Sequence, residues 1–176
     1  MIVVVITGPI ASGKSTLGRA VAVELAHRGH DSAVVDLDLV YEMLDPSRGP
    51  KTDEVRWRDA RRLAGKIAAG LRGRRSAVVV EGEFTTDEQR HDFCSELPQE
   101  LRASFVTLTV DFDEAWLRAI ADPTRGMSKD KDFLAAHYRA LDNAKWGHED
   151  LVIDTGTVSV SVAARSVADS LLRTSE

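Results

Sequence analysis

The residues best suited to chemistry begin with a glycine-rich run near the start of the chain. Residues 8–15 read GPIASGKS and fit the pattern G-x-x-x-x-G-K-[ST]. Glycines let a backbone turn tightly enough for several amide N–H groups to point at one anion, and the positive end of a helix beginning near Lys14 adds to the attraction. In this pattern the lysine reaches the β- and γ-phosphates of a nucleotide, and the hydroxyl after it binds Mg²⁺. The run therefore predicts a nucleoside triphosphate site, with contacts from Gly8, Ala11, Ser12, Gly13, Lys14, Ser15 and Thr16.

Two aspartates follow the second apolar run, in the segment VVDLDLVYEML. Asp36 and Asp38 are two residues apart, so their side chains would point to the same side if the strand continued through them. One carboxylate could hold Mg²⁺ through water, and the other could orient a substrate hydroxyl or accept its proton. We expect Asp36 to support the metal and Asp38 to be the catalytic group. The alternative is that one of them caps the following helix.

A third apolar run, VVVEGEF, ends in two glutamates. Glu81 occupies the Walker-B position, at which a carboxylate can hold the water shell of Mg²⁺. Together with the Ser15 hydroxyl and Asp36, it completes the expected set of metal-supporting groups. Glu83 is an alternative ligand, and both glutamates could also be surface carboxylates at a strand end.

The apolar pattern locates the elements that must position these residues. Apolar, β-branched segments alternate with helical patterns, which is typical of a parallel sheet covered by helices on both sides. Right-handed crossovers then bring the carboxyl ends of the strands to one edge, where ligands bind. We therefore predict a single α/β domain over residues 1–176, with three layers and a five-stranded parallel sheet. The expected strands are 1–7, 32–38, 76–84, 103–110 and 150–154, and the expected helices are 14–28, 54–72, 86–97, 113–121, 129–144 and 159–172.

The run GPIASGKST and the segment LAHRGHDSAVVDLD resemble those of one enzyme group. They are similar to the small P-loop kinases related to nucleoside monophosphate kinases, among them shikimate kinase, gluconate kinase, adenylylsulfate kinase and chloramphenicol phosphotransferase. The resemblance covers most of the chain in layout, and its most specific part is the phosphate loop. It implies a P-loop NTPase fold and the transfer of a phosphoryl group.

The resemblance also implies roles for residues beyond the third strand. A mobile lid, here at about 114–135, would fold over the phosphates, and Arg125 in its loop would meet the charge that develops on the transferred group. Arg118 on the preceding helix would contact the nucleotide, and Asp154 and Thr155 would lie at the edge of its base. For the lid segment, a solvated helix connection is the alternative.

The helix expected at 54–72 would lie over the acceptor site in such a kinase. It carries several arginines, one of which could grip an anionic or polyhydroxylated substrate, while the alternative is that they form its solvated face. The arginines of this helix are Arg56, Arg58, Arg61 and Arg62. A nearby set of apolar side chains could line a pocket for an aromatic acceptor or belong to the core, namely Tyr41, Met43, Leu44 and Trp57.

The expected function is transfer of the γ-phosphoryl group of ATP, with Mg²⁺, to a hydroxyl of a small molecule such as an antibiotic, a sugar-like compound or another metabolite. An adenylylsulfate or nucleotide-type kinase is an alternative, although Leu39 stands where that branch usually has an asparagine. The shikimate branch is weakened because EGEF, and not three glycines, follows the third strand. A regulatory GTPase is disfavoured because the chain has no Asn-Lys-x-Asp motif. A non-enzymatic ATP-binding switch is the alternative from another class.

The composition of the chain limits its partners. The 176 residues carry a net charge of −5, which favours neither nucleic acid nor an acidic membrane surface, and no apolar run approaches the length of a membrane span. The single cysteine, Cys94, excludes an intramolecular disulfide and a zinc site made of thiolates. We expect a cytoplasmic protein, a monomer or homodimer, that binds neither nucleic acid nor a membrane.

Overall fold

Five parallel strands form the central sheet of the computed structural model, which describes residues 1–45, 51–141 and 151–173. The strand order is β2-β3-β1-β4-β5, and every neighbouring pair is parallel. This confirms the predicted α/β fold and its five-stranded parallel sheet. The strands are β1 (Ile2–Thr7), β2 (Ser32–Asp36), β3 (Ala77–Glu81), β4 (Ala103–Thr109) and β5 (Leu151–Asp154).

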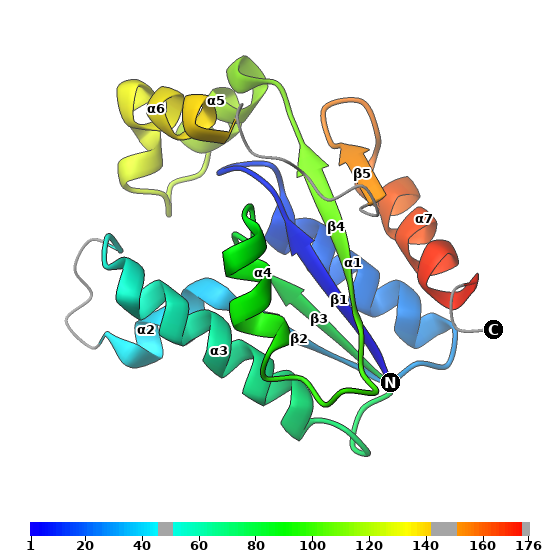
Figure 1. The fold of residues 1–176 in the computed structure, drawn as a ribbon. Helices are drawn as coiled ribbons and strands as arrows, with labels where there is room; N and C mark the ends of the chain where they lie inside the picture. Colours follow the sequence, from blue (N-terminus) through cyan, green and yellow to red (C-terminus); the bar gives the residue numbers. More distant parts are fainter. Residues whose placement is uncertain (46–50, 142–150, 174–176) are drawn as a thin grey trace.

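Helices connect these strands in the alternating order that the sequence predicts (Figure 1). Each crossover returns the chain to the same end of the sheet, so the carboxyl ends of the strands share one edge. The helices are α1 (Lys14–His27), α2 (Leu37–Leu44), α3 (Glu54–Gly70), α4 (Asp87–Cys94), α5 (Phe112–Ala121), α6 (Lys131–Leu141) and α7 (Val160–Arg173), with the 3₁₀ turn η1 (Met127–Lys129) before α6.

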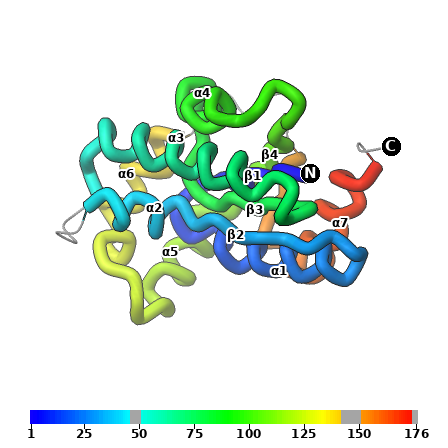
Figure 2. The backbone as a smooth tube through the Cα atoms, turned by 90° about the horizontal axis from the view of Figure 1, so that it is seen from below, coloured from blue at the N-terminus to red at the C-terminus, as the bar shows by residue number. Residues whose placement is uncertain are grey.

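Two apolar clusters fill the space on the two sides of the sheet, which Figure 2 shows between its helical layers. Because successive side chains of a strand point to opposite faces, β1 contributes to both clusters. Val4 and Ile6 pack with α1 and α7, whereas Val3 and Val5 pack with α2, α3 and α4. Burial of each such side chain contributes about 1.5–3 kcal/mol. The sheet is therefore a rigid support for the loops at its edge.

A third cluster lies beyond the carboxyl ends of β1 and β4, where Figure 1 shows α5 and α6. Ala115 and Ala119 of α5 and Leu134 of α6 pack against Ala11 in the loop after β1. The segment expected as a lid is therefore in contact with the glycine-rich loop. None of the helices in the described ranges has the length and apolar character needed to cross a membrane.

One boundary differs from the sequence prediction in a way that affects the site. The strand expected at 32–38 ends at Asp36, and a helix begins at Leu37, which agrees with the alternative that one of the two aspartates caps a following helix. The Asp36 carboxylate caps this helix, since Oδ1 accepts the backbone N–H of Asp38 at 2.9 Å. Leu37 and Tyr41, four residues apart, are buried on its inner face. The prediction that the strand carries Asp36 and Asp38 on one side is therefore wrong.

The other boundaries agree with the predicted ones within a few residues. Some expected features lie outside the described residues. They are part of the connection between the strand expected at 32–38 and the helix expected at 54–72, the end of the helix expected at 129–144 and the start of the strand expected at 150–154.

Candidate active site

The glycine-rich loop adopts backbone conformations that small residues favour. Gly13 has a φ of 91°, and Ala11, which is not a glycine, has a φ of 64°. A Cβ atom on Gly8 would lie 2.6 Å from the carbonyl oxygen of Leu108, so only glycine allows the loop to pass so close to β4. Left-handed backbone of this kind turns successive N–H groups into a concavity that binds anions. The loop therefore has the form that the phosphate-binding prediction requires.

Lys14 begins α1, and its ammonium group folds into the loop. Nζ donates hydrogen bonds of 2.9 Å to the carbonyl oxygens of Gly8 and Pro9. Burial lowers the pKa of Lys14 from its usual value, and nearby carboxylates, of which Glu83 has the largest effect, act in the opposite direction. A phosphate group could take the place of the two carbonyl contacts and give this partly desolvated cation a charged partner.

The three groups expected to support a metal lie together at the ends of β2, β3 and the start of α1. Asp36 and Glu81 are register partners across the two strands, and Glu81 is buried. Burial raises the pKa of Glu81, a contact with the Ser15 hydroxyl lowers it, and the neighbouring Asp36 carboxylate raises it. A cation among these oxygens would offset the repulsion between the two carboxylates.

This set of donors suits Mg²⁺, which prefers oxygen ligands and binds through one or two carboxylates together with phosphate groups. Among the described residues, no cluster of three or more His, Cys, Asp or Glu side chains could hold a metal by itself. Phosphate oxygens of a bound nucleotide would add to the ligands of a Mg²⁺ ion at this place. The buried Ser12 hydroxyl, which has no hydrogen-bond partner in the described part of the chain, leaves the loop with a further polar group to satisfy.

Asp38 lies in the first turn of α2, with an exposed side chain. Lys51 donates hydrogen bonds from Nζ to Asp38 Oδ1 at 2.8 Å and to Glu42 Oε1 at 2.9 Å. Although burial acts against it, these carboxylates raise the pKa of Lys51. The Trp57 indole fixes the lysine backbone by donating to its carbonyl oxygen at 3.1 Å. Nothing in the sequence singles out Lys51, because its loop has no periodic pattern.

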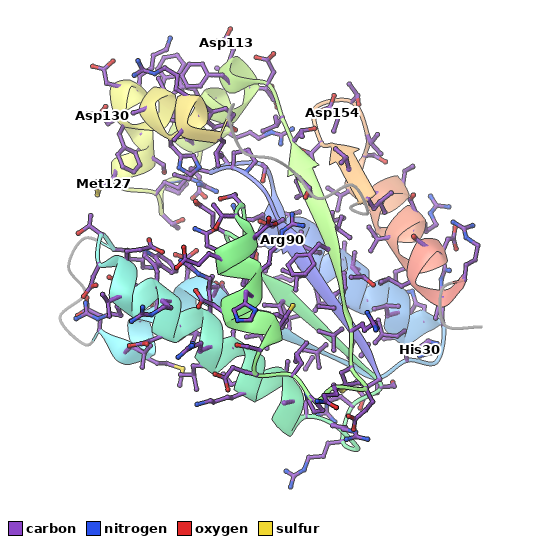
Figure 3. The ribbon with its side chains drawn as sticks, in the orientation of Figure 1. His30, Arg90, Asp113, Met127, Asp130 and Asp154 are labelled. Carbon is purple, nitrogen blue, oxygen red and sulfur yellow. The ribbon has the colours of Figure 1, made fainter. Side chains whose placement is uncertain are left out.

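Arg118 on α5 and Thr155 after β5 lie beside the phosphate loop. The guanidinium group donates to the hydroxyl of Thr155 at 3.0 Å and to its carbonyl oxygen at 2.9 Å, and the hydroxyl donates to the carbonyl oxygen of Ser12 at 2.9 Å. Asp154 has a different contact, because its Oδ1 accepts the N–H of Gly156 at 2.9 Å. The structure therefore brings Arg118 and Thr155 together with the loop. Asp154 lies at the end of β5 (Figure 3).

Arg125 lies in the turn between α5 and η1. Its Nε contacts Asp122 Oδ2 at 3.2 Å, and about one third of its side chain is exposed. The positive charge of Arg125 also lowers the pKa of Lys14, which places the arginine within electrostatic reach of the phosphate loop. The geometry fits a cation that can exchange an exposed carboxylate for a phosphate.

The end of the lid segment also touches the phosphate loop. The backbone N–H of Ile10 donates to Nε2 of His137, and the hydroxyl of Tyr138 donates to the carbonyl oxygen of Ile10. Both side chains belong to α6. Neither residue was predicted, because adjacent polar and aromatic residues on an amphipathic helix carry no signal for a partner more than a hundred residues away.

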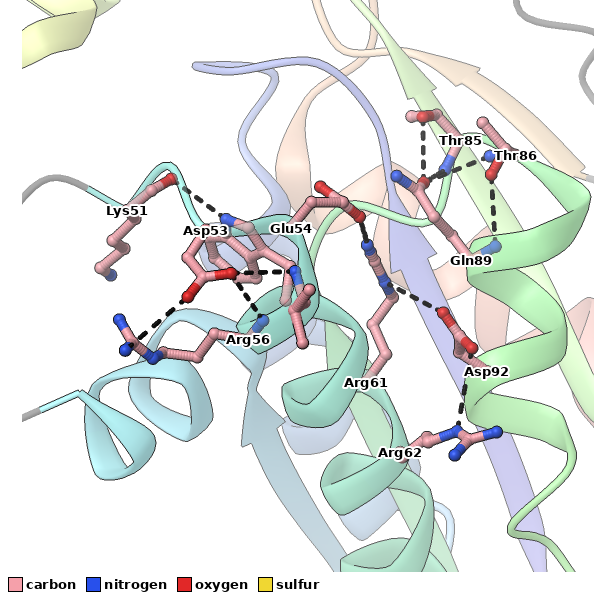
Figure 4. Close-up of polar contacts among 12 residues, drawn as sticks. Lys51, Asp53, Glu54, Arg56, Arg61, Arg62, Thr85, Thr86, Gln89 and Asp92 are labelled. Atoms are coloured by element: carbon pink, nitrogen blue, oxygen red, sulfur yellow. Dashed lines mark hydrogen bonds and ion pairs between the residues drawn. The ribbon is translucent and has the colours of Figure 1, made fainter.

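Two arginines of α3, Arg61 and Arg62, take part in ion pairs with α4 (Figure 4). Arg61 is buried, pairs with Glu54 on its own helix, and lies 3.9 Å from the Asp92 carboxylate on α4. Arg62 reaches the same aspartate. The interpretation of these arginines as a solvated face is therefore wrong for Arg61, which ties α3 to α4.

The apolar side chains considered as a substrate wall divide into two groups. Tyr41 is buried, and its ring centroid lies 4.3 Å from that of Trp57, so this pair is part of the packing between α2 and α3. Met43 and Leu44 are exposed at the end of α2. The structure therefore supports the core interpretation for Tyr41 and Trp57.

A hollow of about 630 Å³ lies far from these residues. It is lined by the chain start and by residues that include His30, Arg72 and Arg75. Figure 3 places His30 at the end of the sheet opposite α5 and α6. The phosphate site is thus separate from this hollow and consists of loop backbone and strand-end side chains.

Solved structures of small kinases overlay on nearly the whole chain. A gluconokinase from Sinorhizobium meliloti 1021 has a TM-score of 0.72 at 20% identity, over 98% of this chain and 92% of its own. A sugar kinase from Janibacter sp. HTCC2649 has a TM-score of 0.73 at 18% identity, over 98% and 95%. A shikimate kinase from Bacteroides thetaiotaomicron has a TM-score of 0.65 at 17% identity, over 97% and 98%. At these identities the likeness establishes the fold.

The family is given by sequence comparison. Curated protein sequences gave no match. A family model described as AAA domain matches residues 3–121, which is more than half of the chain and includes the phosphate loop, the acids after β2 and β3, and α5. The protein is therefore a member of this AAA domain family, with the fold of the small P-loop kinases related to nucleoside monophosphate kinases.

Proposed function

We propose that the protein transfers the γ-phosphoryl group of ATP to a hydroxyl of a small molecule. The observation that carries the proposal is the set of acids within electrostatic reach of Lys14, which includes Asp38 besides Glu81 and Glu83. A nucleotide-binding switch needs a phosphate loop and acids that support Mg²⁺. A phosphotransferase needs one more acid, which orients or deprotonates the acceptor. Asp38, two residues beyond the cap of α2, supplies it.

In the proposed reaction the acceptor oxygen attacks the γ-phosphorus in line, while the bond from the γ-phosphorus to the bridging oxygen of ADP breaks. Asp38 accepts the proton of the attacking hydroxyl. Lys14 and the amides of the loop hold the β- and γ-phosphates. Arg125 leaves Asp122 and meets the charge that develops on the oxygens of the transferred group.

The remaining candidate residues bind and orient the nucleotide. Ser15, Asp36 and Glu81 would hold Mg²⁺, which supplies positive charge at the phosphate oxygens. Arg118 and Thr155 would lie beside the nucleotide, and Asp154 would lie at the edge of the base pocket. The contacts of Ser15, Arg118 and Thr155 support their assignments. The assignment of Asp154 rests on the resemblance to the small P-loop kinases.

Lys51 affects which acceptors fit this site. In the described part of the chain, the contact of Lys51 with the Asp38 carboxylate involves Oδ1, which leaves Oδ2 for an acceptor hydroxyl. The ammonium group would lie next to that hydroxyl and would favour acceptors with several hydroxyls or a negative charge. Sugars and sugar acids are therefore the first candidates, in line with the gluconokinase and the sugar kinase that share this fold.

The test is a coupled assay of ADP release with Mg·ATP and a panel of acceptors: sugars, sugar acids, nucleosides, nucleotides, adenylylsulfate, aminocyclitols, and phenicol or aminoglycoside antibiotics. With the acceptor that responds, Asp38→Asn should lower kcat by roughly 10²–10⁴-fold, the usual contribution of a general base. Lys14→Ala should lower kcat/KM by about 10²–10³-fold. Glu42→Gln is the matched control, because Glu42 lies on the same helix and also contacts Lys51.

The outcomes separate the alternatives. Loss of turnover in Asp38→Asn together with near wild-type turnover in Glu42→Gln would support the assignment of Asp38. Full activity of Asp38→Asn with the true acceptor would refute it. Tight binding of Mg·ATP without turnover on any acceptor would favour a nucleotide-binding switch instead. A response to adenylylsulfate or a nucleotide alone would favour the nucleotide-type kinase.

A further inference from the structure

Two adjacent side chains of α6 contact both backbone groups of a single residue in the phosphate loop. The N–H of Ile10 donates to Nε2 of His137 at 3.3 Å, and the hydroxyl of Tyr138 donates to the carbonyl oxygen of Ile10 at 3.0 Å. These contacts are partly buried, so water competes with them less than at a surface. They involve none of the residues that the proposed reaction uses directly.

The contact with His137 acts on a peptide group that also holds Lys14. A trans peptide is planar and its N–H and C=O point in opposite directions, so fixing the N–H of Ile10 fixes the carbonyl of Pro9. That carbonyl accepts hydrogen bonds from Lys14 Nζ at 2.9 Å and from the N–H of Ser12 at 3.3 Å. A hydrogen-bond chain therefore runs from the imidazole through one peptide to the ammonium group, and such chains strengthen their members.

The contact with Tyr138 acts on the next peptide group. Fixing the carbonyl of Ile10 also fixes the opposite direction of the N–H of Ala11. Ala11 has a left-handed φ of 64°, which a non-glycine residue keeps only where its surroundings hold it. The surroundings are α5 and α6, whose alanines and Leu134 pack against Ala11. The lid helices thus supply both the packing and the hydrogen bonds that hold this part of the loop.

The hydrogen bond from Ile10 needs an Nε2 atom without a proton, and the same atom lies 3.8 Å from Oε2 of Glu83, which follows β3. Burial lowers the pKa of His137, Glu83 acts in the opposite direction, and Lys14 at the start of α1 lowers it further. Burial raises the pKa of Tyr138 to about 12, so its hydroxyl keeps the proton that it donates.

We propose that His137 and Tyr138 are positioning residues for the nucleotide, which hold the two peptide groups of Ile10 so that the phosphate loop and Lys14 are ordered before ATP binds. The inference rests on the proposed function, because it concerns the same nucleotide site. A site ordered in advance loses less conformational freedom on binding, so its affinity is higher. Because linked equilibria are reciprocal, bound nucleotide must in turn stabilise the contact between α6 and the loop.

The test compares the dissociation constant of Mg·ATP, measured by calorimetry, in the wild type and in single variants. His137→Ala and Tyr138→Phe each remove one hydrogen bond and should each raise the dissociation constant by roughly fivefold. His137→Gln should stay within about twofold of the wild type, because the carboxamide oxygen can accept from Ile10. Tyr41→Phe is the matched control for Tyr138→Phe, because it removes a buried tyrosine hydroxyl from the packing between α2 and α3, away from the phosphate loop.

Two further readouts separate positioning from a general loss of stability. In steady-state assays, the KM for ATP should rise while kcat at saturating ATP and the KM for the acceptor stay the same. In the nucleotide-free protein, amide hydrogen exchange at residues 8–12 should be faster in His137→Ala, while exchange in β1 and β3 stays the same.

Each outcome bears on the proposal. Equal dissociation constants in the wild type, His137→Ala and Tyr138→Phe would overturn it and leave the proposed function intact. If His137→Gln binds as weakly as His137→Ala, the hydrogen bond to Ile10 is not the cause, and the proposal fails for His137. If the wild type itself does not bind Mg·ATP, the proposed function fails, and this inference fails with it.

Discussion

At the scale of single residues, the site brings together carboxylates that repel each other and that a bound cation would stabilise. Glu81 is buried beside Asp36, and its pKa is raised first by burial and also by that neighbour. A buried carboxylate with a raised pKa lowers folding stability at neutral pH, because its charged form is less favourable in the folded state. Such a residue is explained by function rather than by the fold, and the function that we propose for Glu81 is support of Mg²⁺.

Glu81→Gln should therefore melt at a higher temperature than the wild type at pH 7.5 without Mg²⁺ or nucleotide. The folded pKa of Glu81 lies above the usual value of 4.5, so the wild type gains stability as the pH falls through the folded pKa toward that value. The difference in melting temperature between the two proteins should shrink from pH 7.5 to pH 4.5. Calorimetric melting curves at several pH values measure it.

The same variant should lose function while it gains stability. Glu81→Gln should be stabilised less by Mg·ATP than the wild type, because one carboxylate that supports the metal is gone. Glu100→Gln, which removes the same charge from an exposed side chain at the hollow near the opposite end of the sheet, is the control. A lower melting temperature for Glu81→Gln at pH 7.5 would mean that the charged carboxylate stabilises the fold, contrary to this argument.

At the scale of elements, the strands were predictable because of how they are buried. β3 is buried along its whole length, and its residues are apolar on both faces, a pattern that few other structures produce. The start of α2 was not predictable by the same reasoning. Leu37 follows β2 without any polar break other than Asp36, and eight residues are too few for a helical period to stand out. The boundary between β2 and α2 lies at Asp36 because its carboxylate caps the first turn of α2.

Residues of the candidate site could be predicted only where their positions depend on residues close to them in the sequence. Lys14 and Ser15 follow from the motif, since their positions depend on one loop and one helix. Lys51 and His137 depend on how distant elements pack: His137 lies 127 residues from its partner Ile10. No local pattern encodes such a contact, so neither residue could be selected from the sequence.

The contact between α3 and α4 gives a prediction for elements. Gly65 on α3 faces α4, and an added Cβ would lie 2.5 Å from the carbonyl oxygen of Phe93. Gly65→Ala should therefore cost about 1–3 kcal/mol of unfolding free energy, as expected for overpacking against backbone. Gly70→Ala in the same helix has no atom within 4 Å of the added Cβ and should be neutral or stabilising by up to about 1 kcal/mol. Urea unfolding measures both, and equal stabilities would contradict close packing at Gly65.

At the scale of the whole molecule, the phosphate loop is the place where the layers meet. Gly8 lies against β4, Ile10 and Ala11 against α5 and α6, and Ser12 against the turn after β5 through Thr155. The sheet itself has a continuous core on each face. A ligand that orders this loop should therefore stabilise the lid helices and the sheet together, which is what a single domain requires.

Thermal unfolding should accordingly show one cooperative transition that shifts as a whole when Mg·ATP binds. At a nucleotide concentration of 100 times the dissociation constant, binding to the folded state adds about 2.7 kcal/mol of stability. For a chain of this length that corresponds to a rise in melting temperature of roughly 5–10 °C. Lys14→Ala should unfold in the same single transition and lose most of the shift, because its effect is on the ligand and not on the core. Two transitions, of which Mg·ATP shifts only one, would contradict this expectation. They would show that the lid helices and the sheet, which contact the phosphate loop from two sides, unfold as separate cooperative units.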